Sequence, residues 1–299
     1  MNHISILLMA YGTPTRENDV EPYLSDIMRG RKPSTLQIED LKRRYRAIGG
    51  KSPLLEITAA QASKLESLLK SKGYDVSVHV GMKHWHPYIT ETVHNILETE
   101  TSRLVGLVLA PHYSRMSIGE YKNLLNSSLM NSQIEIDFID SWCGNPTYQK
   151  AISDKVTEAL QRFPNPKLVH VIFTAHSLPE RILKDGDPYP SQLLDTCKSI
   201  AKFSNVEEWS FAYQSAGHTP EKWLGPDLLE ALEKFNKPSN VLVVPIGFVS
   251  DHLEILYDID IEAQTFAREH GINLHRSESL NASPSFIAAL SDVVSNRIS

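Results

Sequence analysis

Short apolar segments alternate along the chain with longer stretches in which apolar residues recur every three or four positions. The short segments are typical of buried parallel strands, and the longer stretches are typical of amphipathic helices. The pattern predicts strands at residues 4–11, 76–82, 104–111, 134–141, 168–175, 209–214, 241–248 and 272–275. Helices are expected between them, for example at residues 57–72, 88–98, 147–163 and 228–235.

The alternation of strands and helices predicts an α/β fold in which helices cover both faces of parallel sheets. The eight strands divide most naturally near residues 141–146, with four on either side. We therefore predict two Rossmann-like domains, residues 1–141 and 142–299, whose four-stranded parallel sheets face each other across a cleft. The last helix of the second domain could pack against the first domain.

Composition and charge narrow the class of protein. The net charge is −6 and no block is rich in Lys and Arg, which argues against a nucleic acid partner. No apolar stretch approaches the roughly 20 residues of a membrane span, and the beginning of the chain lacks a signal-peptide pattern. We therefore expect a cytoplasmic protein without a transmembrane segment. A monomer is expected because no exposed apolar stripe requires a partner.

The cysteine content excludes several kinds of site. Cys143 and Cys197 are the two cysteines, and they do not form a CxxC motif. A disulfide framework, a structural zinc site and a four-cysteine iron–sulfur cluster are therefore not expected. The motifs GxGxxG, GxxxxGK[ST] and GxSxG are also absent, which disfavours a nucleotide enzyme or an α/β-hydrolase.

Ligands of open α/β sheets bind beyond the carboxyl ends of the strands, so polar residues that follow strands are the candidates for chemistry. One such segment follows the strand at 241–248. Asp251 is expected to cap a helix that begins near Leu253, and Glu254, Asp258 and Glu262 then recur at intervals of four residues. They would form one stripe with an axial spacing of about 6 Å. Its apolar neighbours favour a wet groove or a metal track over a solvated face.

A second segment ends the strand at 168–175. His176 stands at its tip, and Pro179 prevents the strand from continuing. Alone, such a histidine is more often a structural group than a ligand. Together with a carboxylate from another strand end, it would suit Fe²⁺ or Zn²⁺ while leaving coordination positions open. A neutral imidazole could also accept a proton during the reaction.

Five segments carry a resemblance to a known family. They are residues 9–14 (MAYGTP), 44–54 (RYRAIGGKSPL), 174–179 (TAHSLP), 223–226 (WLGP) and 245–254 (PIGFVSDHLE). Together they closely resemble ferrochelatases, in register from about residue 4 to about residue 296, and most of all the short enzymes of Gram-positive bacteria. The resemblance implies two Rossmann-like domains around a porphyrin cleft, as in class II chelatases.

The resemblance also implies an activity, which is insertion of Fe²⁺ into a porphyrin in heme biosynthesis. Coproporphyrin III is the expected substrate and iron-coproporphyrin III the product. Three alternatives stay open: a ferrochelatase acting on protoporphyrin IX, a cobaltochelatase acting on sirohydrochlorin, and a non-enzymatic porphyrin or heme carrier. Fe²⁺ is then a substrate, and no tightly bound cofactor or iron–sulfur cluster is expected.

Site residues follow from the same resemblance. His176 and Glu254 match the catalytic pair that faces the metal, and Tyr11 matches an axial ligand of the inserted iron on the opposite side. Residues that match contacts to the macrocycle are Arg29, Arg44, Tyr45, Ser52 and Tyr121. Arg44, Asp258 and Glu262 match an outer site for Mg²⁺ or another divalent cation.

The sequence departs from the family pattern at one of these contacts. Met28 stands where similar Gram-positive enzymes carry the first of two arginines. Arg29 or Arg31 is then left to contact the propionate that the missing arginine would bind.

Overall fold

The computed structural model describes residues 3–129, 132–217, 219–235 and 239–299, and these form two parallel sheets of four strands each. The strands are β1 (Ile4–Ala10), β2 (Val76–Met82), β3 (Arg103–Val108), β4 (Glu135–Ile139), β5 (Val169–His176), β6 (Trp209–Gln214), β7 (Ser239–Pro245) and β8 (Ile272–Arg276). Every predicted strand is present, and its ends lie within three residues of the predicted ones. The predicted α/β fold with two four-stranded parallel sheets is confirmed.

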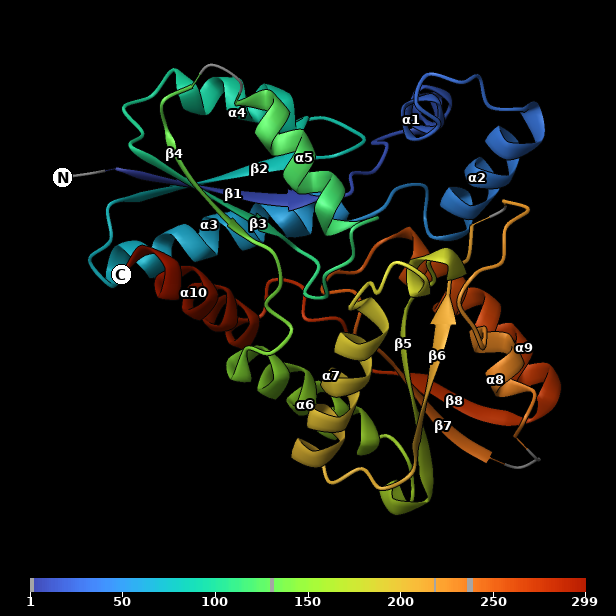
Figure 1. Cartoon of the computed structure of the whole chain (residues 1–299). Helices are drawn as coiled ribbons and strands as arrows, with labels where there is room; N and C mark the ends of the chain where they lie inside the picture. Colours follow the sequence, from blue (N-terminus) through green and yellow to red (C-terminus); the bar gives the residue numbers. More distant parts are fainter. Residues whose placement is uncertain (1–2, 130–131, 218, 236–238) are drawn as a thin grey trace.

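Helices cover both faces of each sheet (Figure 1). They are α1 (Val20–Ile27), α2 (Thr35–Ala47), α3 (Leu54–Ser71), α4 (Ile89–Leu97), α5 (Ile118–Ser128), α6 (Pro146–Leu160), α7 (Tyr189–Phe203), α8 (Leu228–Leu232), α9 (Gln264–His270) and α10 (Pro284–Ile298). Short 3-10 helices lie at Glu17–Asp19, Pro166–Leu168 and Glu180–Leu183, and a π-helix covers Ile255–Ala263. No helix in the described ranges is long and apolar enough to cross a bilayer.

The two sheets share one large apolar core. On β1, Ile6 and Leu8 belong to the same buried cluster as Leu65 of α3 and Phe173 of β5. The opposite face of the first sheet packs on α4 and α5, and that of the second packs on α8, the π-helix and α9. The division at residues 141 and 142 falls between β4 and α6, and as a boundary between independent domains it stays a prediction.

The last helix, α10, lies against both α3 and α6 (Figure 1). Lys72, at the end of α3, donates a hydrogen bond to Ser291 of α10 at 2.8 Å. Thr147 of α6 donates one to Asp292 of α10. The end of the chain is therefore tied to helices that precede and follow the predicted boundary.

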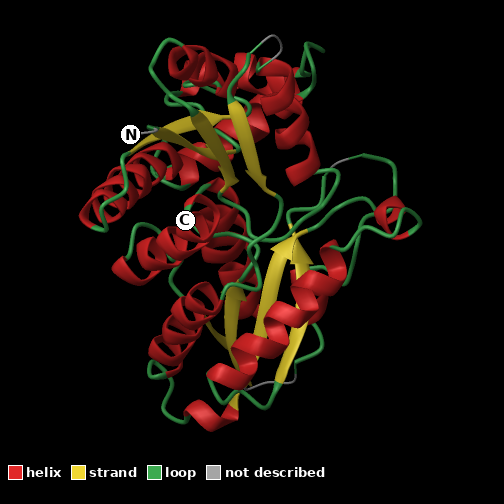
Figure 2. Cartoon of the chain, turned by 60° about the vertical axis from the view of Figure 1, so that its left-hand side comes forward, coloured by secondary structure: helices red, strands yellow, loops and turns green. Residues whose placement is uncertain are grey.

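Both sheets have the same strand order, β2-β1-β3-β4 and β6-β5-β7-β8, although no repeat is evident in the sequence. In each sheet the first strand in the chain lies between its two successors, and this is the point at which the order reverses. The carboxyl ends of both sheets point toward the middle of the molecule (Figure 2). Tyr11 follows β1 and His176 ends β5, so equivalent positions of the two sheets supply them.

The acidic segment differs from the expected α-helix. It begins as a helix at Leu253 and continues as a π-helix from Ile255 to Ala263. The π-helix is a rare form, found most often at functional sites. The predicted cap by Asp251 is wrong. Its carboxylate instead accepts hydrogen bonds from Ser279 at 2.7 Å and Asn281 at 2.9 Å, because the chain returns beside it after β8.

Candidate active site

A cleft lies between the carboxyl ends of the two sheets, and its walls are mainly apolar. Both halves of the chain contribute apolar side chains, among them Leu54, Val108, Leu178 and Val249. Most of the predicted site residues line it, namely Tyr11, Tyr45, Ser52, Tyr121, His176 and Glu254. Residues separated by more than 240 positions are thus brought to one cavity. Such a cavity suits a flat, largely apolar ligand.

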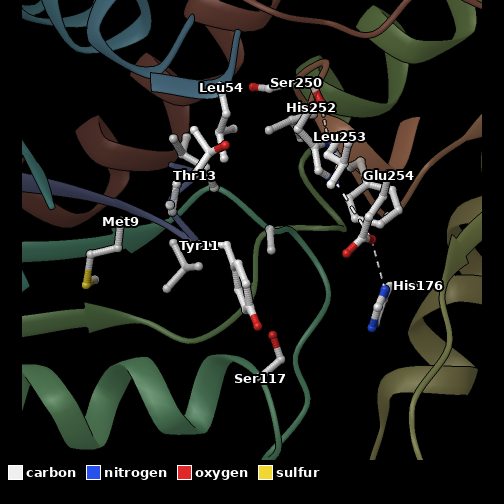
Figure 3. Close-up of a pocket in the computed structure, with 18 of the residues that line it drawn as sticks. Met9, Tyr11, Thr13, Leu54, Ser117, His176, Ser250, His252, Leu253 and Glu254 are labelled. Carbon is white, nitrogen blue, oxygen red and sulfur yellow. Dashed lines mark hydrogen bonds and ion pairs between the residues drawn. The ribbon is translucent and has the colours of Figure 1, made fainter. Parts of the chain in front are cut away.

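His176 and Glu254 form a direct pair on one wall (Figure 3). His176 Nδ1 lies 3.0 Å from Glu254 Oε2, and the side chains keep 33% and 34% of their exposure. Burial lowers the pKa of His176, but the Glu254 carboxylate outweighs it, so the pKa of the imidazole is raised overall. Burial likewise opposes ionisation of Glu254, and the neighbouring imidazole holds the pKa of that carboxyl well below its usual range. The pairing therefore favours the imidazolium form of His176 and the carboxylate form of Glu254.

The surroundings of His176 fix its orientation. Tyr189 donates a hydrogen bond to the His176 backbone carbonyl at 2.9 Å. The rings of Trp223 and Phe248 meet the imidazole edge-on, with centroids 6.5 and 6.3 Å away. His252 Nε2 lies 3.9 Å from Glu254 Oε2 on the side away from His176. A second imidazole thus faces the same carboxylate.

Tyr11 stands on the opposite wall (Figure 3). Its ring projects into the cavity with the hydroxyl directed toward Ser117, and the residue keeps 43% of its exposure. Partial burial and the carboxylates of Glu254, Glu120 and Asp26 raise the pKa of its phenol. The phenol of Tyr11 is therefore neutral, and it becomes an anion only when a cation or a base draws its proton away.

Hydroxyl groups line the rest of the first-half wall. The Tyr45 hydroxyl lies 2.8 Å from Thr13 Oγ1, and Ser52 Oγ accepts a hydrogen bond from the backbone N–H of Leu54 at 3.3 Å. Tyr121 is buried, and the Lys83 ammonium lies 5.2 Å from its ring centroid. Tyr45 and Ser52 are buried as well, so these hydroxyl groups lie in the interior of the cleft.

The predicted outer site lies beside the cleft. Arg44 donates to Asp258 Oδ1 at 3.3 Å and to Asp40 at 3.1 Å, and its guanidinium lies over the Tyr257 ring at 4.8 Å. Burial, followed by repulsion from Glu254, raises the pKa of Asp258 to about 6. Glu262 is exposed. The acidic stripe thus leads from the cleft, through a buried carboxyl group, to the surface.

Arg44 itself is not among the residues that line the cleft. Across the residues with described positions, no group of three or more His, Cys, Asp or Glu side chains is arranged to hold a metal ion. Two carboxylates beside an arginine would need water or substrate as further ligands for a cation.

Arg29 also lies outside the cleft. Its side chain keeps 82% of its exposure and pairs with Glu120 at 3.1 Å, in a shallow pocket beside the main cavity. Arg31 donates a hydrogen bond to the backbone carbonyl of Met28 at 3.2 Å and is exposed. Neither arginine fills the place of a guanidinium inside the cleft.

Two groups near the cleft were not assigned from the sequence. His112 lines it but is almost fully buried, and its Nε2 lies 2.9 Å from Thr196 Oγ1 of α7. Burial lowers the pKa of this imidazole to about 3, so it is neutral. Asp26 of α1 pairs with His84 behind Tyr11. A sequence signal marks His84 as a strand-end residue, but none marks Asp26.

Comparison with solved structures identifies the fold. The sirohydrochlorin chelatase SirB from Bacillus subtilis subspecies spizizenii, solved with cobalt, superposes with a TM-score of 0.58 at 12% identity, covering 99% of this chain and 95% of its own. This likeness shows that the chain shares the fold of this chelatase.

Comparison with sequences defines the family. The ferrochelatase family model matches residues 3–298. A protein named ferrochelatase from Herpetosiphon aurantiacus is 44% identical and covers 98% of either chain. One named coproporphyrin III ferrochelatase from Geobacillus sp. strain WCH70 is 42% identical, over 99% of this chain and 98% of its own. The chain belongs to the ferrochelatase family, so the predicted family and the prediction of an enzyme are confirmed.

Proposed function

We propose that this protein inserts Fe²⁺ into a porphyrin, with coproporphyrin III as the substrate and His176 and Glu254 as the catalytic pair. The observation that carries the proposal is the hydrogen-bonded imidazole–carboxylate pair, which faces a tyrosine across a mainly apolar cleft. A flat macrocycle between the two walls would present one face to the pair and the other to Tyr11.

The pair has the chemistry that insertion requires. Two pyrrole N–H protons must leave the macrocycle when a divalent ion enters. The ionised Glu254 would receive the protons one at a time, and because its pKa is held low it would pass each one on, so that it acts as a relay. His176 shares the proton through Nδ1, and His252 lies on the far side of the same carboxylate. Tyr11 would meet the inserted iron from the opposite face.

The acidic stripe offers a path for ions. Glu262 is at the surface, Asp258 is buried, and Glu254 is in the cleft. With its pKa near 6, Asp258 exchanges protons readily at neutral pH. We propose that Arg44, Asp258 and Glu262 form an outer site that a divalent cation visits, with Arg44 moderating the negative charge.

The preference for coproporphyrin III is supported by the relatives that bear this name. Coproporphyrin III carries four propionates, whereas protoporphyrin IX carries two. Hydroxyl groups of Tyr45 and Ser52 in the cleft are suitable hydrogen-bond donors to carboxylates. Arg29 would need to leave Glu120 to reach a propionate, and its exposure leaves it free to do so.

An anaerobic insertion assay tests this function. The purified chain receives Fe²⁺ with coproporphyrin III in one arm and protoporphyrin IX in the other, and the absorption bands of the free base are followed over time. Faster loss of the coproporphyrin bands is expected. If both porphyrins bind but neither loses its free-base bands, the protein is a carrier and the proposed activity is wrong.

A variant arm tests the assignment of the pair. His176→Ala and Glu254→Ala are expected to abolish insertion while porphyrin binding, measured by fluorescence quenching, survives. Glu91→Gln is the control, because Glu91 also pairs with a histidine, His86, at 3.1 Å but lies outside the cleft. Insertion at the wild-type rate in either alanine variant would exclude the pair as the catalytic groups.

A further inference from the structure

Behind Tyr11 lies a second histidine–carboxylate pair, formed by Asp26 and His84. Asp26 belongs to α1, and its Oδ2 lies 2.7 Å from His84 Nδ1. The His84 ring in turn packs on the Tyr11 ring, with centroids 4.6 Å apart and planes tilted by 57°. The order Asp26, His84, Tyr11 therefore leads from the surface to the wall of the cleft.

The backbone holds His84 and Tyr11 side by side. The parallel pairing of β1 and β2 continues beyond both strands, with Lys83 N–H bonded to the carbonyl of Ala10 and His84 N–H to that of Tyr11, each at 2.9 Å. Gly12 permits this close approach, because its φ is +98° and a Cβ there would lie 2.9 Å from the backbone nitrogen of Trp85.

His84 does not itself line the main cleft. It lines the adjoining shallow pocket, together with Asp26, Arg29, Lys83 and Glu120. On the far side of that pocket, Glu120 is occupied by Arg29 and Lys83. The imidazole keeps 14% of its exposure and is fixed by the bond to Asp26, so it forms a stationary surface against one side of the phenol.

Tyr11 needs such a surface, because the residue is exposed to 43%. An exposed phenol on a loop samples several rotamers, and a hydroxyl that must meet the centre of a macrocycle loses effectiveness when it is poorly oriented. We propose that Asp26 and His84 are positioning residues that hold the Tyr11 hydroxyl toward the centre of the bound porphyrin without contacting the substrate. This rests on the proposed function, and the experiment below separates the two.

Kinetics provide the first measurement. His84→Ala is expected to lower kcat for iron insertion about fivefold to tenfold, with KM for the porphyrin unchanged, because one ring contact and one charge-assisted hydrogen bond are lost. Asp26→Asn should cost about threefold, since an amide can still accept the bond but carries no charge. His84→Phe keeps a ring against Tyr11 and should recover part of the loss. Because Asp26 is partly exposed, its variant also keeps the test valid if His84→Ala does not fold.

The chain contains a matched control on the same segment. His86 Nδ1 lies 3.1 Å from Glu91, and the His86 ring meets the Tyr88 ring with centroids 4.5 Å apart. This pair has the same chemistry but lines neither described pocket. His86→Ala should leave kcat, KM and the spectrum of the bound product unchanged.

Spectroscopy provides the second measurement, which a merely structural role would not affect. Complexes of the wild type and of Tyr11→Phe with iron-coproporphyrin III define the two ends of a scale in the visible bands. His84→Ala should lie between them, and His86→Ala should coincide with the wild type. If the wild type inserts iron and His84→Ala matches it in kcat and spectrum, the positioning role is refuted. A change in KM alone, or identical wild-type and Tyr11→Phe spectra, would also refute it, whereas a wild type that inserts no iron refutes the proposed function instead.

Discussion

Glu254→Gln is the most direct perturbation of the proposed site. Glutamine has the shape of glutamate and can still accept the hydrogen bond from His176 Nδ1, which spans 3.0 Å in the native protein. The substitution removes only the negative charge and the capacity to bind a proton. Loss of iron insertion in this variant would therefore report on proton transfer and not on packing.

The size of the effect follows from the surroundings of the pair. Without the Glu254 charge, the pKa of His176 is expected to fall, because burial opposes protonation and only Asp258 remains to favour it. A positioned proton acceptor contributes about 10²–10⁴ in rate. We therefore expect kcat to fall at least about a hundredfold, equivalent to about 3 kcal/mol in the activation barrier. KM for the porphyrin should change little, because the apolar walls remain.

The same pair predicts a pH dependence of stability. The lowered pKa of Glu254 contributes stability above its ordinary value of 4.5, and this contribution is lost as the pH falls through the folded-state pKa. The raised pKa of His176 contributes below 6.5 and is lost as the pH rises through the folded-state pKa. Both contributions are complete between about pH 4.5 and 6.5. The stability deficit of Glu254→Gln should be largest there, at about 1 kcal/mol after allowance for exposure.

Anaerobic insertion assays and urea denaturation at several pH values measure the two effects. Glu91→Gln, which removes the charge from the surface pair with His86, is the control for both. A kcat of Glu254→Gln within threefold of the wild type, with normal porphyrin binding, would refute the assignment of this carboxylate as proton acceptor.

Three further predictions concern the acidic stripe and the Tyr11 loop. Burial raises the pKa of Asp258 to about 6 from 3.8, so the native state keeps the proton of this carboxyl group to a higher pH than the unfolded chain does. As the pH rises from 4 to 7, the free energy of unfolding of the wild type should therefore fall by up to about 3 kcal/mol relative to that of Asp258→Asn. Urea denaturation at both pH values measures this, and a constant difference between the two proteins would contradict it. Gly12→Ala should cost about 1–3 kcal/mol of stability, because φ is +98° and Trp85 occupies the space of the methyl group, and an unchanged denaturation midpoint would contradict it. Glu262→Gln should raise KM for Fe²⁺ about twofold to fivefold without changing kcat, because the substitution removes charge from the exposed end of the stripe. If KM for Fe²⁺ is unchanged, Glu262 is not part of the ion path.

The sheets were predictable because their signal is local. The central strands are nearly continuous apolar runs that are buried on both faces, which leaves little freedom in their assignment. In β5, for example, five successive residues from Val171 to Ala175 are buried. The polar residues after these runs had to meet at the carboxyl ends. His176, Glu254 and Tyr11 could therefore be named from the sequence, although their pairing across the cleft required the fold.

Other features depend on contacts between distant segments. Asp251 reads as a helix cap, but Ser279 and Asn281 bind it from a loop 28 to 30 residues later. A helical spacing does not distinguish an α-helix from the π-helix that carries Asp258. Arg44 was expected to contact the macrocycle, yet its guanidinium is directed to Asp258 and Tyr257. The hydrogen bond between Asp26 and His84 joins residues 58 positions apart, so the local sequence pattern does not indicate it.

The position of α10 restricts how the two halves of the molecule can move relative to each other. This helix contacts both α3 and α6 and so links the two halves along one edge of the molecule. Gln61 of α3 adds hydrogen bonds to Ser250 and to the backbone carbonyl of Asn281. On the side of the molecule away from α10 lie α1 and α2 (Figure 1), which contribute Tyr23 and Tyr45 to the lining of the cavity. We therefore expect a large flat molecule to enter and leave on the α1–α2 side.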